Sequence, residues 1–192
     1  MLDLKLCIEP IPAESELNQK QLLVTEEERR TAASFGHERR RTEYLLWRHT
    51  VRRELGEDAE IAYSESGAPF IKNRNINIGI SHSRDFVAVI ISPRRCAVDI
   101  ESLARNFQQI SSRYISEAES RLSDDPRLPA VLWCAKETLY KYAGRKELDL
   151  LRDIRIERVD FDRRTVTGRI GEGNPTELHI LFYGEQLVVY IG

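Results

Sequence analysis

The chain has 192 residues, of which 29 are lysine or arginine, 31 are aspartate or glutamate and 41% are hydrophobic. This composition fits one globular unit or two small packed halves, and it excludes collagen, a coiled coil and a disordered chain. The formal net charge of -2 excludes the overall basic surface of a protein that grips nucleic acid, so we expect no nucleic-acid partner. Any bound anion must be held by local arginines.

The sequence shows no sign of export or of membrane insertion. No segment approaches the roughly 20 apolar residues that span a bilayer, and residues 1–10 lack a basic start followed by an apolar run. We therefore expect a cytoplasmic protein with no membrane partner. Cys7, Cys96 and Cys134 are odd in number and far apart, which excludes a disulfide framework and a paired-cysteine zinc site. We expect three buried thiols.

The first half predicts a strand, two helices and several short strands. Apolar residues alternate with other residues over 2–8, which is typical of a strand with one buried face. Thr25 and Glu28 have the spacing of a capping box, and Gly36 ends the helix that begins there. A second helix is expected over 37–55. Short strands are expected over 61–63, 70–71, 76–81 and 86–92.

The second predicted helix is rich in arginine. Its apolar residues fall broadly on one side, and the remainder carries Arg39, Arg40, Arg41, Arg48, Arg52 and Arg53. Such a run is usually a solvated helix face, and the pattern alone leaves this interpretation open beside anion binding.

The second half repeats the order of helices followed by strands. A strand over 96–101 precedes short helical stretches near Ile110 and over 116–122. A strong helix is expected from 126 to about 143, with Asp124 or Asp125 as its cap and Pro126 in its first turn. Strands are expected over 154–161, 165–170, 178–183 and 187–191. The prediction is an α+β fold of two similar halves, 1–92 and 93–192, each with helices packed on a small antiparallel sheet.

Two acids mark the first strand of the second half. Asp99 and Glu101 are separated by one residue, so both carboxylates project from the same strand face. They repel each other unless a cation lies between them. The alternative is a strand that simply ends in solvent.

The following helix carries a stripe of Trp133, Glu137 and Lys141 at i, i+4 and i+8, with Lys136 and Tyr140 beside it. The alternative is an ordinary Glu–Lys pair worth about 0.3–0.5 kcal/mol. Three carboxylates and a lysine can instead hold Mg²⁺ and the oxygens of a phosphate ester, because Mg²⁺ prefers few carboxylates, several waters and substrate phosphates.

Four segments occur in a characteristic order. They are Gly-Ile-Ser-His-Ser over 79–83, Val-Ala at 87–88, Ala-Val-Asp-Ile-Glu over 97–101 and Trp-Cys-Ala-Lys-Glu-Thr-Leu-Tyr-Lys over 133–141. In this order and spacing the chain resembles the 4'-phosphopantetheinyl transferases of the Sfp type. The resemblance implies transfer of phosphopantetheine from coenzyme A to a serine of an acyl, peptidyl or aryl carrier protein, with release of adenosine 3',5'-bisphosphate. It also implies pseudo-twofold symmetry, with the coenzyme in the cleft between the halves.

The resemblance also implies roles for acids and cations in the second half. Asp99, Glu101 and Glu137 correspond to the Mg²⁺ ligands of the family. Glu137 is also similar to the residue that is thought to draw the proton from the serine, and Lys141 to the cation facing the pyrophosphate.

Coenzyme recognition is implied for the first half. His82 and Arg41 resemble residues that hold the 3'-phosphate, with Arg48 as a further candidate and Ser81 in the same motif as His82. The segment Gly67-Ala68-Pro69 departs from the family pattern, which has Lys or Arg between Gly and Pro. Lys72 or Arg74 is the candidate replacement for that missing cation.

Two other functions fit part of the pattern. A metal-dependent nuclease also uses paired acids and a lysine, but Glu101 is followed by Ser102 and Leu103 rather than by the usual acid-x-Lys step. A catalytically idle coenzyme A or carrier-binding module has no need for three carboxylates around an anionic ligand. We therefore expect a Mg²⁺-dependent transferase, and a monomer because two pseudo-equivalent halves favour one.

Overall fold

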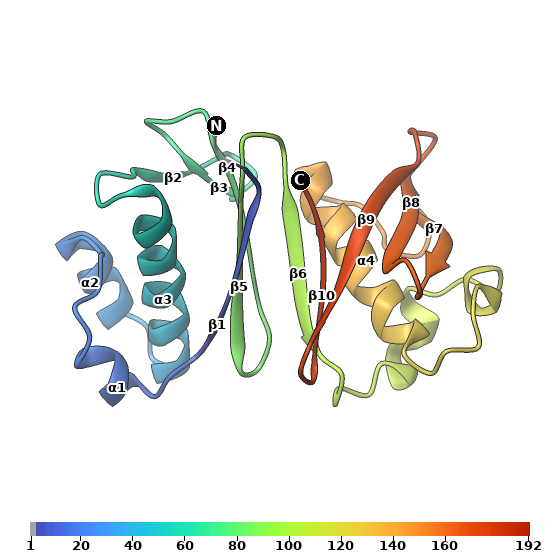
Figure 1. The fold of residues 1–192 in the computed structure, drawn as a ribbon, viewed down its shortest axis with the longest axis horizontal. Helices are drawn as coiled ribbons and strands as arrows, with labels where there is room; N and C mark the ends of the chain where they lie inside the picture. The colour runs from blue at the N-terminus through green and yellow to red at the C-terminus, as the bar shows by residue number, and fades with distance from the viewer. Residues whose placement is uncertain (1–2) are drawn as a thin grey trace. The chain divides into compact units, whose positions relative to one another are not determined.

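A computed structural model describes residues 3–192, and Leu2 of the predicted first strand lies outside the described residues. Contacts along the chain divide it into two compact units, Met1–Arg94 and Arg95–Gly192. Each unit combines helices with antiparallel strands, which confirms the predicted α+β class (Figure 1). Within residues 3–192, none of the helices has the length and apolar character needed to cross a membrane.

The first unit packs helices against a three-stranded sheet. Its elements are β1 (Lys5–Pro10), α1 (Glu14–Asn18), α2 (Glu26–Ala33), α3 (Glu38–Leu55), β2 (Ile61–Tyr63), β3 (Pro69–Ile71), β4 (Asn77–His82) and β5 (Phe86–Ser92). The sheet order is β1-β5-β4, and β2 and β3 form a separate hairpin. The helices lie on one face of the sheet, where Val51 of α3 shares a core with Val87, Val89 and Ile91 of β5 (Figure 1).

The predicted capping box is confirmed at the start of α2. The Glu28 N–H donates to Oγ1 of Thr25 at 3.1 Å, and the Thr25 N–H donates to Oε2 of Glu28 at 2.8 Å. The second predicted helix is also confirmed as α3, which is followed by Gly56 at φ 108°.

The interpretation of the α3 arginines as a solvated face is wrong for two of them. Arg48 and Arg52 are only 2% and 6% exposed. The Arg48 guanidinium carbon lies 3.2 Å and 4.0 Å from the ring centroids of Tyr44 and Trp47. Arg52 donates to both carboxylate oxygens of Glu28 at 2.6 Å and 2.9 Å. These two guanidinium groups are buried because stacking and a carboxylate partner replace their water.

The first strand differs from its prediction in position and in burial. It runs over Lys5–Pro10, and its Cys7 is half-buried, whereas Cys96 and Cys134 are buried as expected. The exposure of Cys7 follows from the edge position of β1, which among the described residues pairs with β5 alone.

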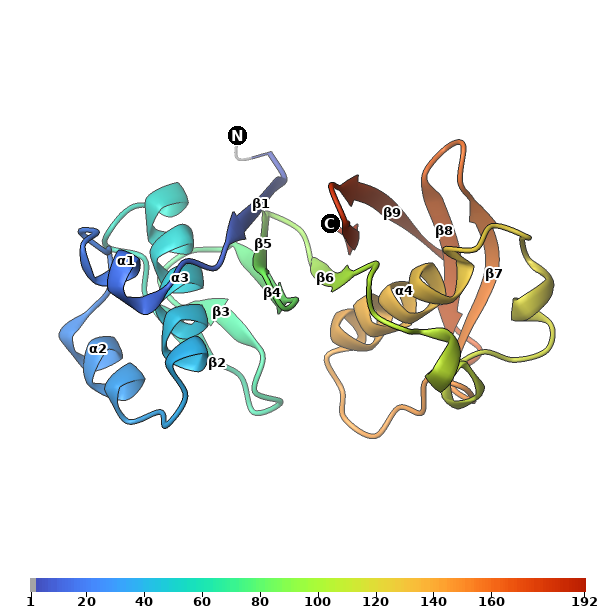
Figure 2. The ribbon, with the colours of Figure 1, turned by 90° about the horizontal axis from the view of Figure 1, so that it is seen from below.

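The second unit wraps a larger sheet around one helix. Its elements are β6 (Ala97–Ser102), the 3₁₀ turns η1 (Gln108–Arg113) and η2 (Glu119–Arg121), α4 (Leu128–Ala143), β7 (Ile154–Asp160), β8 (Thr165–Ile170), β9 (Thr176–Tyr183) and β10 (Gln186–Ile191). The sheet order is β6-β10-β9-β8-β7. The helix α4 packs against β6, β7, β8 and β10 (Figure 2).

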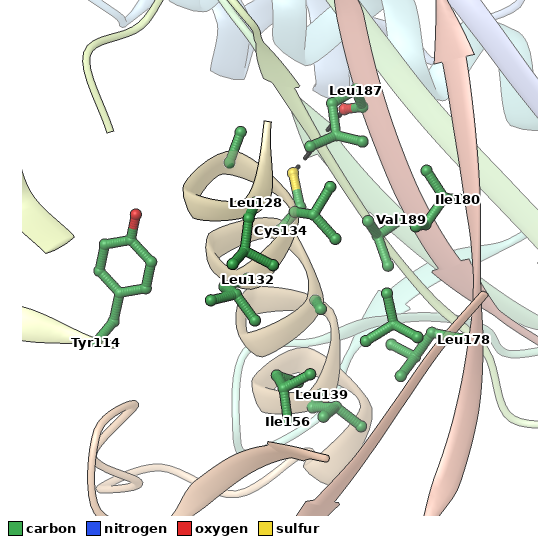
Figure 3. Close-up of a cluster of buried hydrophobic side chains, with 14 of the residues drawn as sticks. Tyr114, Leu128, Leu132, Cys134, Leu139, Ile156, Leu178, Ile180, Leu187 and Val189 are labelled. Atoms are coloured by element: carbon green, nitrogen blue, oxygen red, sulfur yellow. Dashed lines mark hydrogen bonds between the residues drawn. The ribbon is translucent and has the colours of Figure 1, made fainter. Parts of the chain in front are cut away.

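The core of the second unit fixes α4 on this sheet. Leu132 and Leu139 of α4 are fully buried and belong to one hydrophobic cluster with Leu178 and Leu187 of the sheet (Figure 3). The Cys134 thiol lies in the same core, 3.9 Å from the Leu187 carbonyl oxygen. Burial raises the pKa of Cys134 well above its ordinary value, with the negative charge of Asp99 adding to the effect. This cysteine is therefore a packing residue.

The start of α4 differs from its prediction. The helix begins at Leu128 after Arg127, and its first turn contains Pro129 rather than Pro126. Neither Asp124 nor Asp125 is the cap, because Arg127 occupies the N-cap position; the Asp125 carboxylate accepts hydrogen bonds from the backbone N–H and the guanidinium of Arg127.

The two units share one feature of strand pairing. In each unit the first strand pairs antiparallel with the last, as in Leu6 opposite Ile90 and Asp99 opposite Val189. The two sheets differ in size: among the described residues, the sheet β1-β5-β4 of the first unit has three strands and the sheet of the second unit has five.

Candidate functional site

The acids of β6 and the stripe on α4 lie close together. The indole Nε1 of Trp133 donates to Oε1 of Glu101 at 2.7 Å. Lys141 Nζ lies 2.8 Å from Oδ1 of Asp99 and donates to the Val98 carbonyl at 3.1 Å. Lys141 therefore reaches from the helix to the strand, and the stripe is more than an exposed ladder of i, i+4 pairs.

Glu137 shares the charged environment of these acids. Burial raises the pKa of Glu137, and the negative charge of Asp99 raises it further. Burial and the charge of Asp99 also raise the pKa of Glu101, although Arg105 and Trp133 act in the opposite direction. Asp99 thus makes it harder for both Glu101 and Glu137 to ionise, which is the condition that an added cation relieves.

The protein's own groups partly balance this charge. Arg105 pairs with Glu101, and its guanidinium lies 4.8 Å from the Trp133 ring centroid. Within residues 3–192, no three His, Cys, Asp or Glu side chains are arranged to hold a metal ion as they stand. The chemistry of the three carboxylates nevertheless fits a hard divalent cation such as Mg²⁺. Holding it requires Asp99 and Glu101 to exchange their contacts with Lys141 and Arg105.

Lys136 lies next to Glu137 in the sequence, but its side chain has a different environment from the stripe of Trp133, Glu137 and Lys141. Its side chain is 0% exposed and its Nζ lies 2.8 Å from Oε1 of Glu119. Neither the contact nor the role of Glu119 follows from the sequence pattern, because the two residues belong to different elements.

The structure does not bring Arg41 and His82 to common partners. Arg41 donates two hydrogen bonds to the Glu14 carboxylate, at 2.6 Å and 2.7 Å, and one to the Phe35 carbonyl. The His82 side chain is 61% exposed, and its Nε2 lies 3.8 Å from Oε2 of Glu43.

The neighbour of His82 on α3 is Arg39, which the sequence interpretation did not single out. Arg39 donates to Oε1 of Glu43 at 2.6 Å and to the Ser83 carbonyl at 2.6 Å. Arg39 and Glu43 are one helical turn apart, whereas Arg41 is rotated from Arg39 by about 200° at 100° per residue. The i, i+4 spacing of Arg39 and Glu43 was the available signal.

The other three coenzyme candidates have separate surroundings. Arg48 lines a cavity of about 630 Å³ together with Tyr44 and Tyr63. The Arg48 guanidinium donates a hydrogen bond to the Tyr63 hydroxyl. The charged residues that line the cavity include the cations Arg52 and Lys72 and the acids Glu27, Glu57, Asp58 and Glu60. Ser81 is 7% exposed on β4, and Lys72 lies 4.0 Å from Glu60.

Both candidate replacements for the missing cation at Ala68 stand beside acids. Lys72 Nζ lies 4.0 Å from a carboxylate oxygen of Glu60. Arg74 pairs with Asp58 and also donates a hydrogen bond to the Leu55 carbonyl.

Comparison with known proteins identifies the second unit. No match was found among curated proteins. The sequence profile of the 4'-phosphopantetheinyl transferase superfamily matches residues 95–190. This segment is half of the chain and runs from β6 into β10, so it contains Asp99, Glu101 and Glu137, whose carboxylates share one charged environment. By sequence profile and by the placement of these acids, the chain belongs to the 4'-phosphopantetheinyl transferase superfamily.

Proposed function

We propose that this chain is an Sfp-type enzyme that transfers 4'-phosphopantetheine from coenzyme A to a serine of an acyl or peptidyl carrier protein, releasing adenosine 3',5'-bisphosphate. The observation that carries the proposal is the shared environment of Asp99, Glu101 and Glu137 beside Lys141, within the segment that matches the superfamily.

The properties of Glu137 fit those of a general base. Its pKa is raised by burial and by Asp99, and a carboxylate with a raised pKa accepts a proton from a hydroxyl more readily. Removing the serine proton lets the oxygen attack the phosphorus of the transferred group. The bond from that phosphorus to the leaving adenosine 3',5'-bisphosphate breaks, so no covalent enzyme intermediate is needed.

Lys141 fits the task of stabilising the leaving group. Its ammonium also donates to the Val98 carbonyl at 3.1 Å, and this contact can keep a positive charge at the edge of the acid site when Asp99 turns to the metal. A fixed cation beside the scissile bond stabilises charge as it moves to the leaving phosphate.

The cofactor of the proposed reaction is Mg²⁺, with Asp99, Glu101 and Glu137 as its protein ligands. Bound Mg²⁺ supplies charge neutralisation at the phosphate oxygens. The raised pKa values of Glu101 and Glu137 support this assignment, because a cation lowers the cost of ionising both.

Recognition of the 3'-phosphate is best supported at His82 and Arg39. His82 offers an exposed imidazole, and Arg39 is 44% exposed beside the same Glu43 carboxylate. Arg39 makes one bond to a carboxylate, that of Glu43, whereas Arg41, the sequence-based choice, makes two bonds to Glu14 with which a phosphate has to compete.

The deciding experiment is a transfer assay read by mass spectrometry. The protein is incubated with coenzyme A, Mg²⁺ and apo acyl or peptidyl carrier proteins, and a carrier is expected to gain one phosphopantetheine unit. Glu137→Gln should abolish most of the gain, whereas Glu117→Gln, at a side chain that is 82% exposed, should not. No gain on any carrier would refute the transferase and favour an idle coenzyme-binding module.

A further inference from the structure

A buried ion pair anchors α4 next to its stripe of functional residues. The side chains of Lys136 and Glu119 are 0% and 2% exposed. Lys136 Nζ lies 2.8 Å from Oε1 and 3.0 Å from Oε2 of Glu119, and it donates to the Leu150 carbonyl at 2.9 Å. Three acceptors thus surround an ammonium that has no access to water.

Glu119 connects three elements through its two carboxylate oxygens. Besides Lys136, it accepts from the N–H and the hydroxyl of Ser116, both at 2.8 Å, and from the N–H of Ile156 at 2.8 Å. The pair therefore joins η2 and the start of β7 to the middle of α4. Its geometry is over-determined, because every charged atom has more than one partner.

Stability alone does not explain such a pair. Burying two opposite charges costs desolvation energy that their attraction repays only in part, and apolar replacements are often neutral or stabilising. The best-attested gain from a buried polar contact is that it selects one register or orientation. For Lys136 and Glu119, that orientation is the rotation of α4.

Glu137 directly follows Lys136 in α4, so any rotation of the helix at Lys136 also displaces the Glu137 carboxylate. On its other side the helix is held by the contacts of Trp133 and Lys141 with the β6 acids. We propose that Glu119 and Lys136 are positioning residues that set the rotation of α4 and so place Glu137 for proton removal. This inference rests on the proposed transferase function.

The main test is the double variant Glu119→Gln/Lys136→Met, which removes both charges while leaving an acceptor for Ser116 and most of the lysine stem. We expect a folded protein whose melting temperature is lowered, because the Ile156 N–H loses its acceptor, and a KM for coenzyme A within about twofold of the wild type. We expect kcat to fall about ten- to a hundredfold, because a small misplacement of a reacting group has an effect of that size.

The matched control is Glu117→Gln/Arg121→Met. It removes the ion pair between two side chains that are 82% and 74% exposed, on the segment that also carries Glu119. Its kcat and KM should be unchanged. A folded Glu119→Gln/Lys136→Met variant with normal kcat overturns the proposal. If that variant does not fold, Glu119→Asp, which keeps the charge but shortens its reach, should lower kcat at unchanged KM, and normal kcat again overturns the proposal.

Binding of Mn²⁺, followed by electron paramagnetic resonance, separates this inference from the proposed function. The double variant should bind Mn²⁺ at least about threefold more weakly than the wild type, because Glu137 is one of three proposed ligands. If the wild type transfers nothing to any carrier, this difference still supports the positioning role while the transferase proposal fails. Equal affinities in that case overturn the positioning role, and a wild type without transfer or Mn²⁺ binding overturns both.

Discussion

The indole N–H of Trp133 on α4 points at Oε1 of Glu101 on β6, with 2.7 Å between the two heavy atoms. The ring is held in place by the edge-on contact with Tyr114, at a centroid distance of 5.1 Å. A rigid aromatic ring therefore aims its single donor at one of the proposed Mg²⁺ ligands.

Trp133→Phe should keep an aromatic ring at this position, although a smaller one, and remove this donor. A hydrogen bond to a charged group contributes about 1.5–3 kcal/mol, so we expect kcat to fall about ten- to a hundredfold with little change in the KM for coenzyme A. The control is Tyr114→Leu, which removes the ring contact with Trp133 but leaves the indole N–H that donates to Glu101. Equal losses in both variants would show that packing, and not the hydrogen bond, supports activity.

Arg39→Gln should weaken the binding of coenzyme A by about tenfold or more. The binding of dephospho-coenzyme A should hardly change, because only coenzyme A carries the 3'-phosphate. Arg41→Gln should affect the two ligands equally, since Arg41 is occupied by Glu14. Calorimetric titration of both variants with both ligands gives the coupling energy directly. Coupling at Arg41 instead of Arg39 would restore the sequence-based assignment.

Acid should destabilise the first unit through Glu28. Burial raises the pKa of Glu28, but hydrogen bonds from Arg52 and Thr25 and the charges of Arg52 and Arg48 outweigh it, so the pKa lies below its ordinary value of 4.5. A lowered carboxyl pKa contributes stability that is present above pH 4.5 and is lost as the pH falls through the folded-state pKa.

This loss can be measured by urea unfolding between about pH 3 and pH 6, followed by Trp47 fluorescence in a Trp133→Phe background. The Glu28→Gln variant should be less stable than the wild type at neutral pH, and its free energy of unfolding should depend less on pH. Glu26→Gln, at a side chain that is 81% exposed, should leave the curve as it is. An unchanged slope in Glu28→Gln would contradict the assignment.

Gly168→Ala should destabilise the second unit. A Cβ at Gly168 would lie 2.8 Å from methyl carbons of both Ile156 and Leu139, and 3.1 Å from the Arg155 carbonyl oxygen. Overpacking of this kind costs about 1–3 kcal/mol in the free energy of unfolding. Combining it with Leu139→Ala should cost less than the sum of the single changes, because one of the clashing methyl groups is then absent. Simple additivity, measured by urea unfolding, would argue against the clash.

Features encoded over a few neighbouring residues were predictable from the sequence. The capping box at Thr25, the extent of α3 and the common face of Asp99 and Glu101 follow from spacing along one element. The approach of α4 to β6 was anticipated by the resemblance to a family and not by periodicity.

Contacts between distant parts of the chain were not predictable. Arg48 and Arg52 look like their exposed neighbours in sequence, and only the packing of α2 and α3 shows that both are buried. Whether Arg39 or Arg41 lies beside His82 depends on the rotation of α3 relative to β4. The run of three arginines over 39–41 does not define this rotation. Glu119 gave no signal, because its partner lies 17 positions further along the chain.

The position of β10 in its sheet has a consequence for how the protein is made. This strand follows the other four strands of its sheet along the chain, yet it lies between β6 and β9 and gives β6 its pairing partner within the described sheet. The strand that carries Asp99 and Glu101 must therefore wait, during synthesis, until residues 186–191 have left the ribosome. Since such long-range pairing folds slowly, the second unit should acquire protease resistance only once residues 186–191 are available to pair, and a chain shortened before Gln186 should never acquire it.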